Sequence, residues 1–212
     1  MPARLAAICF DAVDPERLSA FWTAALVPPP SLPIRFRAVA APKSAKNPIH
    51  LDLSTSSLDD QAATVERLLA LGAMHADVGQ TGDESHVVLA DPEGNELCVL
   101  EPGNGFVDPA SRFGSITCDG SRDVGVFWSE VLGWPLVWDQ DGETAIRHPD
   151  ATGPFVTWGP PVPTPSAAAA SRHHLVLAGP ETDRLVALGA TPTALGTFLD
   201  PDGYEFLVEA PD

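Results

Sequence analysis

The chain alternates between short apolar runs, which are typical of strands, and segments with apolar residues at helical spacing. This pattern predicts a repeated order of strands and helices. Residues 5–11 form a short apolar run with strand character. A helix is expected at residues 15–26, because Asp14 can cap it, Pro15 suits its first position and apolar residues then follow at helical spacing. Two further strands are expected at residues 34–40 and 49–54.

The next segment predicts a second helix and a closing hairpin. Ser57 or Asp59 can cap the helix, and Gly72 is typical of a helix end. The hairpin is expected within residues 87–100, where two apolar runs flank the turn Asp-Pro-Glu-Gly-Asn. Pro and Gly stand where a tight reversal needs them. One unit therefore contains two successive groups of a strand, a helix and further strands.

Three motifs of the first unit return in the same order in the second. Phe21-Trp22 returns as Phe127-Trp128. The run at 67–73, Arg-Leu-Leu-Ala-Leu-Gly-Ala, and the run at 91–96, Asp-Pro-Glu-Gly-Asn-Glu, return with few changes at 184–190 and 200–205. A period near 100 residues indicates duplicated domains rather than a solenoid.

The duplication predicts two domains, at residues 1–102 and 112–212, joined by a polar, turn-rich linker at 103–111. The second copy holds extra residues ahead of His174, enough for a three-strand meander. The first copy is therefore expected to have a shortened first half. A Pro- and Ala-rich stretch at 160–171 is expected to be a mobile loop.

Charge and composition exclude several classes of partner. Acidic residues outnumber basic ones 29 to 12, and the net charge of −17 repels nucleic acid and anionic lipid alike. No apolar stretch reaches the length of a membrane span, and the start lacks the long apolar segment of a signal peptide. Cys9, Cys98 and Cys118 show no CxxC spacing, which is typical of free thiols in a reducing compartment. We therefore expect a cytoplasmic protein with a small-molecule partner.

The ordered motifs resemble the vicinal oxygen chelate superfamily, which includes glyoxalase I, bleomycin-resistance proteins and extradiol dioxygenases. The run at 43–52, which contains His50 and Asp52, resembles its glyoxalase-like branch. The resemblance implies an α+β fold of tandem duplicated βαβββ modules, whose curved mixed sheets form cups around a ligand. Because the superfamily hosts isomerases, dioxygenases, epimerases and drug-sequestering proteins, function has to be argued from the site.

The resemblance also implies where a metal ion would be held, with one ligand from each of four strands. His50 and His174 occupy the position after the crossover in the two copies. The first-strand positions fall on Ala7 and Phe113, and the last-strand positions on Cys98 and Leu207. Because divalent ions need several converging donors, we expect no metal and no other cofactor, and divalent metal is the less favoured alternative.

Two acidic residues lie close to the implied last-strand position in sequence. Glu96 and Glu205 precede that position by two residues, which corresponds to about 7 Å along a strand. We therefore expect them to be too far away to complete a site. A mixed site of His50 and Cys98 offers two ligands, too few for zinc.

Strand parity predicts the orientation of His50 and Asp52. Apolar residues alternate with them at 49–54, so both side chains should face the concave side of the sheet. His50 and Asp52 are the weak catalytic candidates, as a pair that could move a proton. The alternative, favoured by the frequency of exposed ion pairs, is that Asp52 pairs with Lys43 or Lys46.

Aromatic residues of the second copy add candidates for ligand contacts. Trp138 and Trp158 fall on the expected meander, where cups of the resembled family grip planar ligands. Trp158 could equally close the core. The predicted ligand-binding set is His50, Cys98, Trp138, Trp158 and His174.

Three functions remain open from the sequence. The first is a glyoxalase-like protein that binds a small apolar or aromatic metabolite without metal. The second is an enzyme, namely a lyase, isomerase or dioxygenase that uses a metal or His50. In the third, the shortened first copy is a docking half that completes the cup of the second copy or of another chain, and a homodimer is then possible.

Overall fold

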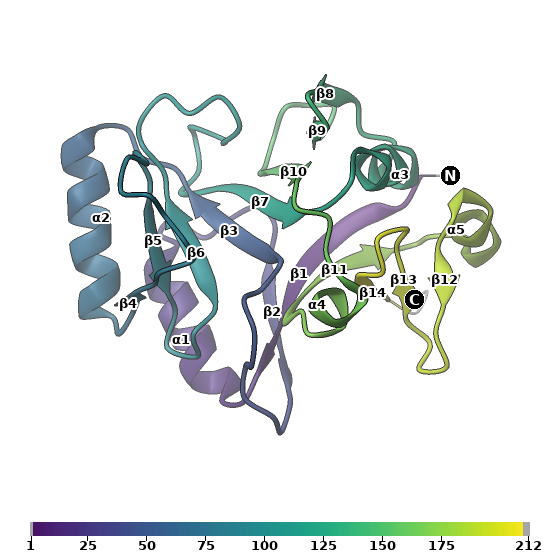
Figure 1. Ribbon diagram of the computed structural model, residues 1–212, viewed down its shortest axis with the longest axis horizontal. Helices are drawn as coiled ribbons and strands as arrows, with labels where there is room; N and C mark the ends of the chain where they lie inside the picture. The colour runs from purple at the N-terminus through teal and green to yellow at the C-terminus, as the bar shows by residue number, and fades with distance from the viewer. Residues whose placement is uncertain (1, 210–212) are drawn as a thin grey trace.

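The computed structural model describes residues 2–209, and its elements follow the expected order in both copies (Figure 1). The first copy contains β1 (Arg4–Ala12), α1 (Pro15–Ala25), β2 (Ile34–Ala38), β3 (Ile49–Leu53), α2 (Leu58–Ala70), β4 (Met74–His75), β5 (Val87–Ala90) and β6 (Glu96–Val99). The second contains β7 (Phe113–Asp119), α3 (Arg122–Leu132), β8 (Leu136–Gln140), β9 (Glu143–Ile146), β10 (Phe155–Gly159), α4 (Pro165–Ala169), β11 (His173–Ala178), α5 (Thr182–Leu188), β12 (Thr191–Pro192), β13 (Phe198–Leu199) and β14 (Glu205–Val208).

Two curved mixed sheets form the fold, and each contains strands from both copies. The order is β12-β13-β14-β11-β1-β2 in the six-stranded sheet and β4-β5-β6-β3-β7-β10-β9-β8 in the eight-stranded sheet. The copies meet where β1 pairs antiparallel with β11, and where β3 pairs antiparallel with β7. The predicted linker at 103–111 therefore separates the two copies in the sequence. Each sheet, however, contains strands from before and after this linker.

The two first halves differ as the sequence predicted. In the second copy, β10 lies parallel to β7 and continues through β9 to the edge strand β8. In the first copy, β2 takes the equivalent place parallel to β1, and the sheet ends there. Copy 1 thus has no counterpart of β8 and β9 among the described residues, which explains why one sheet has two strands fewer.

Local signals fix the helix ends. Asp14 accepts a hydrogen bond from the backbone N–H of Arg17 at 3.1 Å, and Pro15 opens α1. Ser57 rather than Asp59 caps α2. The expectation of a mobile loop at residues 160–171 is wrong in part, because α4 forms there. A threonine cap and a run of alanine, the best helix former, explain that short helix.

A continuous apolar core lies between the sheets and their helices. Phe10 meets the Trp22 ring edge-on at 5.4 Å between centroids, and Trp128 meets Phe206 in the same way at 5.0 Å. All four rings are almost fully buried. Full burial of such a side chain stabilises the fold by roughly 1.5–3 kcal/mol. Within residues 2–209, no helix has the length and apolar character needed to cross a membrane.

Candidate functional site

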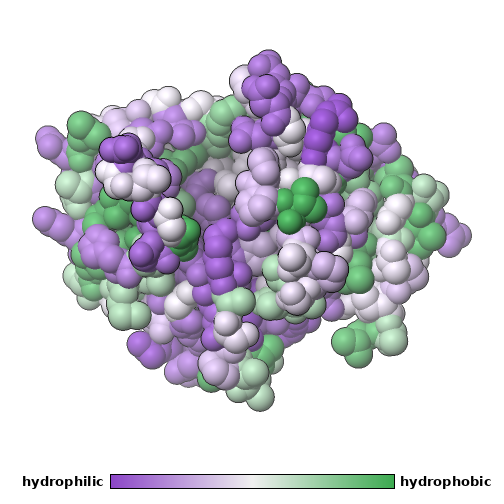
Figure 2. Space-filling model, in the orientation of Figure 1, coloured by the Kyte–Doolittle hydropathy of each residue, from purple (hydrophilic) through white to green (hydrophobic). Residues whose placement is uncertain are grey.

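The eight-stranded sheet curves around an open pocket of about 480 Å³. The pocket is lined by strand residues of both copies and by two loops that follow β4 and β6. Figure 2 shows the surface hollowed between the part that carries α2 and the part that carries β8 and β9. This volume suits a small organic molecule, since ligand pockets commonly measure about 300–1,000 Å³.

One row of cross-strand neighbours spans the floor of this pocket. Trp138 lies opposite Ala145, and Ala145 lies opposite Thr157. Thr157 in turn lies opposite Thr117, and Thr117 opposite His50. Directly opposed residues of neighbouring strands point to the same face. The row therefore joins the indole supplied by copy 2 to the imidazole supplied by copy 1 across one concave surface.

His50 and Asp52 form a pair at one end of the row. His50 Nε2 lies 3.3 Å from Asp52 Oδ1, with 16% and 8% of the two side chains exposed. The other carboxylate oxygen accepts hydrogen bonds from Ser115 Oγ at 2.8 Å and Thr117 Oγ1 at 2.5 Å. Thr157 Oγ1 donates to Thr117 Oγ1 at 3.0 Å, which extends the chain of contacts along the floor.

The alternative pairing of Asp52 with a lysine is wrong. Lys43 Nζ lies 2.6 Å from Glu96, and Lys46 Nζ lies 2.8 Å from Asp119. Each lysine therefore has a carboxylate partner other than Asp52. The charged partner of Asp52 is thus His50 and not a lysine.

The pair carries opposite charges in the folded protein. Burial disfavours charge on His50, but the adjacent Asp52 carboxylate outweighs it and raises the pKa of the imidazole well above its ordinary value. Burial likewise opposes ionisation of Asp52, yet His50 and the two hydroxyl donors lower the pKa of this carboxyl group. Burial raises the pKa of the Cys98 thiol, which keeps it protonated at neutral pH.

The site brings three potential metal donors together, one more than the sequence indicated. Donor atoms of His50, Asp52 and Cys98 all lie within 4.8 Å of one another. Asp52 and Cys98 are opposed across the parallel pair β3–β6, a pairing that sequence spacing does not reveal. Asp52 Oδ1 is buried and accepts no hydrogen bond of good geometry from residues 2–209. These residues would fit a zinc-type ion held by three protein ligands.

The two tryptophans of the meander have different surroundings. Trp138 is half-buried at the pocket, with Phe106 edge-on at 5.3 Å. Its Nε1 is buried and has no hydrogen-bond partner within the described part of the chain. Trp158 borders the pocket but belongs to the main apolar core and is 2% exposed. For Trp158, the core-closing alternative is therefore the better description.

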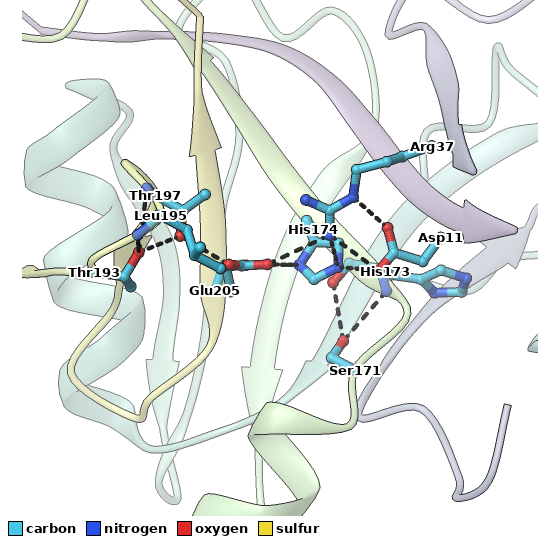
Figure 3. Close-up of polar contacts among 9 residues, drawn as sticks. All are labelled: Asp11, Arg37, Ser171, His173, His174, Thr193, Leu195, Thr197 and Glu205. Atoms are coloured by element: carbon cyan, nitrogen blue, oxygen red, sulfur yellow. Dashed lines mark hydrogen bonds and ion pairs between the residues drawn. The ribbon is translucent and has the colours of Figure 1, made fainter. Parts of the chain in front are cut away.

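His174 lies in the other sheet, away from the remaining predicted residues. It shares one face of the six-stranded sheet with Asp11, Arg37 and Glu205 (Figure 3). Glu205 was expected to be too distant from the histidine, yet its Oε2 lies 3.6 Å from His174 Nδ1. The long Glu side chain reaches back along the strand, which a count of Cα spacings omits. Asp11 and Arg37 were not among the predicted site residues, because their pairing depends on the β1–β2 register.

The neighbouring His173 points to the opposite face, as parity requires. It is fully buried and stacks on Phe10 with 3.8 Å between ring centroids. Its Nδ1 lies 2.7 Å from the carbonyl oxygen of Ile49 and therefore donates to it. Burial lowers the pKa of His173 to about 3, so it is a neutral core residue.

Comparison with known families agrees with this architecture. Residues 7–100 and 115–209 each match the profile of a family described as a glyoxalase-like domain. The chain belongs to this glyoxalase-like family. The matched segments cover both copies, so the duplication read from the motifs is a duplication of this domain.

Solved structures show the same fold at low sequence identity. Glyoxalase I from Zea mays is 11% identical, with a TM-score of 0.61 over 97% of this chain and 92% of that one. A putative dioxygenase from Bacillus subtilis is 14% identical, with a TM-score of 0.50 over 97% and 76% of the two chains. No curated protein sequence matches the chain. At these identities, the likeness to the solved structures establishes the fold alone.

Proposed function

We propose that this glyoxalase-like protein binds a small organic molecule, with an apolar or aromatic part, in the pocket of the eight-stranded sheet. The observation that carries the proposal is the row from Trp138 to His50, which joins an aromatic wall to a buried charged pair. The apolar end is formed by Trp138, Phe106 and Ala145.

The polar atoms of the pocket define what such a ligand should present. Trp138 Nε1 carries a proton and has no acceptor among residues 2–209, so a carbonyl, carboxylate or phenolic oxygen of a ligand could accept from it. Thr157 Oγ1 gives its proton to Thr117 and keeps lone pairs for a ligand donor. Buried polar groups without partners cost free energy, and a ligand that satisfies them recovers it. A planar molecule that bears oxygen substituents would fit both the aromatic end of the pocket at Trp138 and its polar end at His50.

Binding can be tested by fluorescence titration of the full chain with a panel of aromatic carboxylates, phenols and α-keto acids. A ligand should alter tryptophan emission in the wild type and lose at least tenfold in affinity in Trp138→Phe. Trp134→Phe is the matched control, because Trp134 borders a different cavity. The proposal fails if no compound binds, or if the two variants bind equally well.

An enzyme that uses a divalent metal is a second candidate, carried by the convergence of His50, Asp52 and Cys98. These three side chains would hold the ion, which would supply Lewis acid activation of a ligand oxygen. Without metal, His50 kept charged by Asp52 could donate a proton to such an oxygen. A lyase, isomerase or dioxygenase reaction is compatible with this arrangement.

Elemental analysis of the untagged protein before and after chelator decides between the two candidates. Near one metal atom per chain, reduced strongly in Cys98→Ser and Asp52→Asn, would support the metal-dependent candidate. Because His50 must lose its proton to bind an ion, affinity should also increase with pH. Less than one-tenth of an atom after growth and purification with added zinc would favour metal-free binding.

A further inference from the structure

One face of the six-stranded sheet, opposite to the side chain of His173, holds a charged cluster centred on one nitrogen of Arg37 (Figure 3). Arg37 Nη2 lies 3.0 Å from Asp11 Oδ2, 3.3 Å from His174 Nε2 and 3.4 Å from Glu205 Oε2. The three partners come from β1, β11 and β14, and Arg37 comes from the edge strand β2. One positively charged atom is thus surrounded by one nitrogen and two oxygen atoms.

The tautomer of His174 follows from its neighbours. Its Nδ1 lies 3.1 Å from the backbone carbonyl oxygen of Glu205, which can only accept, so Nδ1 carries a proton. In the neutral ring, Nε2 then presents a lone pair toward Arg37 Nη2 at 3.3 Å, and the same nitrogen lies 3.4 Å from Asp11 Oδ2. A ring nitrogen that presents its lone pair to a cation, with the other N–H held by a carbonyl, is also the arrangement of a metal-bound histidine.

The carboxylates around Arg37 are oriented by further contacts. Asp11 binds the guanidinium through both oxygens, because Oδ1 lies 2.6 Å from Arg37 Nε. Glu205 Oε1 accepts a hydrogen bond from Thr197 Oγ1 at 2.8 Å, which leaves Oε2 for the cation. Two carboxylates facing one guanidinium leave the cluster one negative charge in excess.

We propose that the Arg37 guanidinium substitutes for a divalent cation in a latent metal site formed by Asp11, His174 and Glu205. The six-stranded sheet is therefore closed to metal by a side chain of the protein itself. A donor set of one imidazole and two carboxylates suits zinc, cobalt or manganese. Metal–ligand bonds of about 2.0–2.2 Å would require the three groups to move inward by roughly 1 Å each. The long Glu205 side chain can follow most readily.

The test removes the guanidinium by the substitution Arg37→Ala and then adds a divalent cation. We would compare cobalt binding by isothermal titration calorimetry in His50→Ala and in the double variant His50→Ala/Arg37→Ala. The His50→Ala background disables the pocket of the eight-stranded sheet, so failure of the proposed function leaves this test intact. The expected result is one additional Co²⁺ per chain in the double variant, with a dissociation constant below 100 μM. Adding His174→Ala should abolish the extra site.

Thermal unfolding gives an independent measurement. The double variant should melt at a lower temperature than His50→Ala, and 1 mM Co²⁺ should restore at least half of the difference. If the double variant does not fold unaided, refolding yields with and without Co²⁺ replace the melting curves, and recovery should depend on the ion and on His174. Equal cobalt stoichiometry in the two proteins, or stabilisation that survives His174→Ala, would overturn the proposal.

Discussion

Trp22 donates its indole N–H to Asp91 across the core, with 3.1 Å between Nε1 and Oδ2. The second copy repeats the contact between Trp128 and Asp200, also at 3.1 Å. Each pair joins the first helix of a copy to the turn of its last hairpin. In each copy, the Phe-Trp motif and the Asp-Pro motif of the hairpin turn are therefore joined by one structural hydrogen bond. Both motifs lie outside the pocket of the eight-stranded sheet.

The third repeated motif binds the C-terminal ends of the same helices. Arg67 donates to the backbone carbonyl oxygens of Ala24 and Ala25, which end α1. Arg184 does the same for the carbonyl oxygens of Glu130 and Val131 at the end of α3. These groups have no partner within their own helix. The duplicated motifs thus preserve the framework of the fold, while the site residues between them differ.

Trp22→Phe should destabilise the protein by about 1–3 kcal/mol, since it leaves a buried carboxylate short of one donor. Trp128→Phe should have a similar effect. Chemical denaturation followed by far-UV circular dichroism would measure the free energy of unfolding. Trp134→Phe serves as the control and should cost less than 1 kcal/mol, because Trp134 is only half-buried. Equal losses in all three variants would contradict a specific role for the indole–carboxylate contact.

Asp200 should make stability depend on pH in a way that Asp200→Asn removes. Burial raises the pKa of Asp200 from 3.8 to about 6, and the Trp128 hydrogen bond only partly opposes this. The folded state therefore binds the proton more tightly than the unfolded state. The resulting stabilisation is fully present below pH 3.8 and is lost as the pH rises through about 6.

We therefore compare the free energy of unfolding of the wild type with that of Asp200→Asn. The value for the wild type minus the value for the variant should fall by on the order of 2–3 kcal/mol between pH 4 and pH 7. Urea denaturation of both proteins at each pH would measure it. A difference that is constant with pH in Asp200→Asn would show that the carboxyl group ionises normally in the folded protein.

Asp52→Asn should change the charge of His50 at neutral pH. In the wild type, the Asp52 carboxylate raises the pKa of His50 well above 6.5. Without it, burial is the remaining strong influence and should move the pKa below that value. Proton–carbon NMR of the imidazole across a pH series would report both values. His75 is exposed and provides an internal reference in the same spectra. A His50 pKa that is unchanged by the substitution would refute the pairing.

Gly125→Ala should destabilise α3, although alanine normally favours a helix. A Cβ atom at position 125 would lie 1.9 Å from Thr144 Oγ1 and 2.8 Å from Thr144 Cβ. Overpacking of this kind costs about 1–3 kcal/mol. Thr144→Ala should rescue part of the loss in the double variant, because it removes the closer atom. Thermal unfolding of the three variants would measure this coupling, and additive effects would exclude a direct clash.

Helix positions, strand parity and the missing hairpin of copy 1 could be predicted from the sequence. Asp14 with Pro15 fixes the start of α1, and the concave orientation of His50 follows from alternation along one strand. These features depend on residues a few positions apart, whose geometry is set by the local backbone. The α4 helix was missed because its composition also suits an irregular segment.

The sequence by itself therefore determined the repeat, the elements and the family resemblance, since each is expressed within a short segment. Only the tertiary structure decided that each sheet combines strands of both copies, four and four in the eight-stranded sheet and two from copy 1 with four from copy 2 in the six-stranded sheet. This arrangement brings His50 and Trp138 into one pocket and places His174 beside Arg37 in the other sheet. It also opposes Asp52 to Cys98 and to Ser115. Pairing between distant strands sets these contacts, and the register of such pairs depends on packing across the whole core.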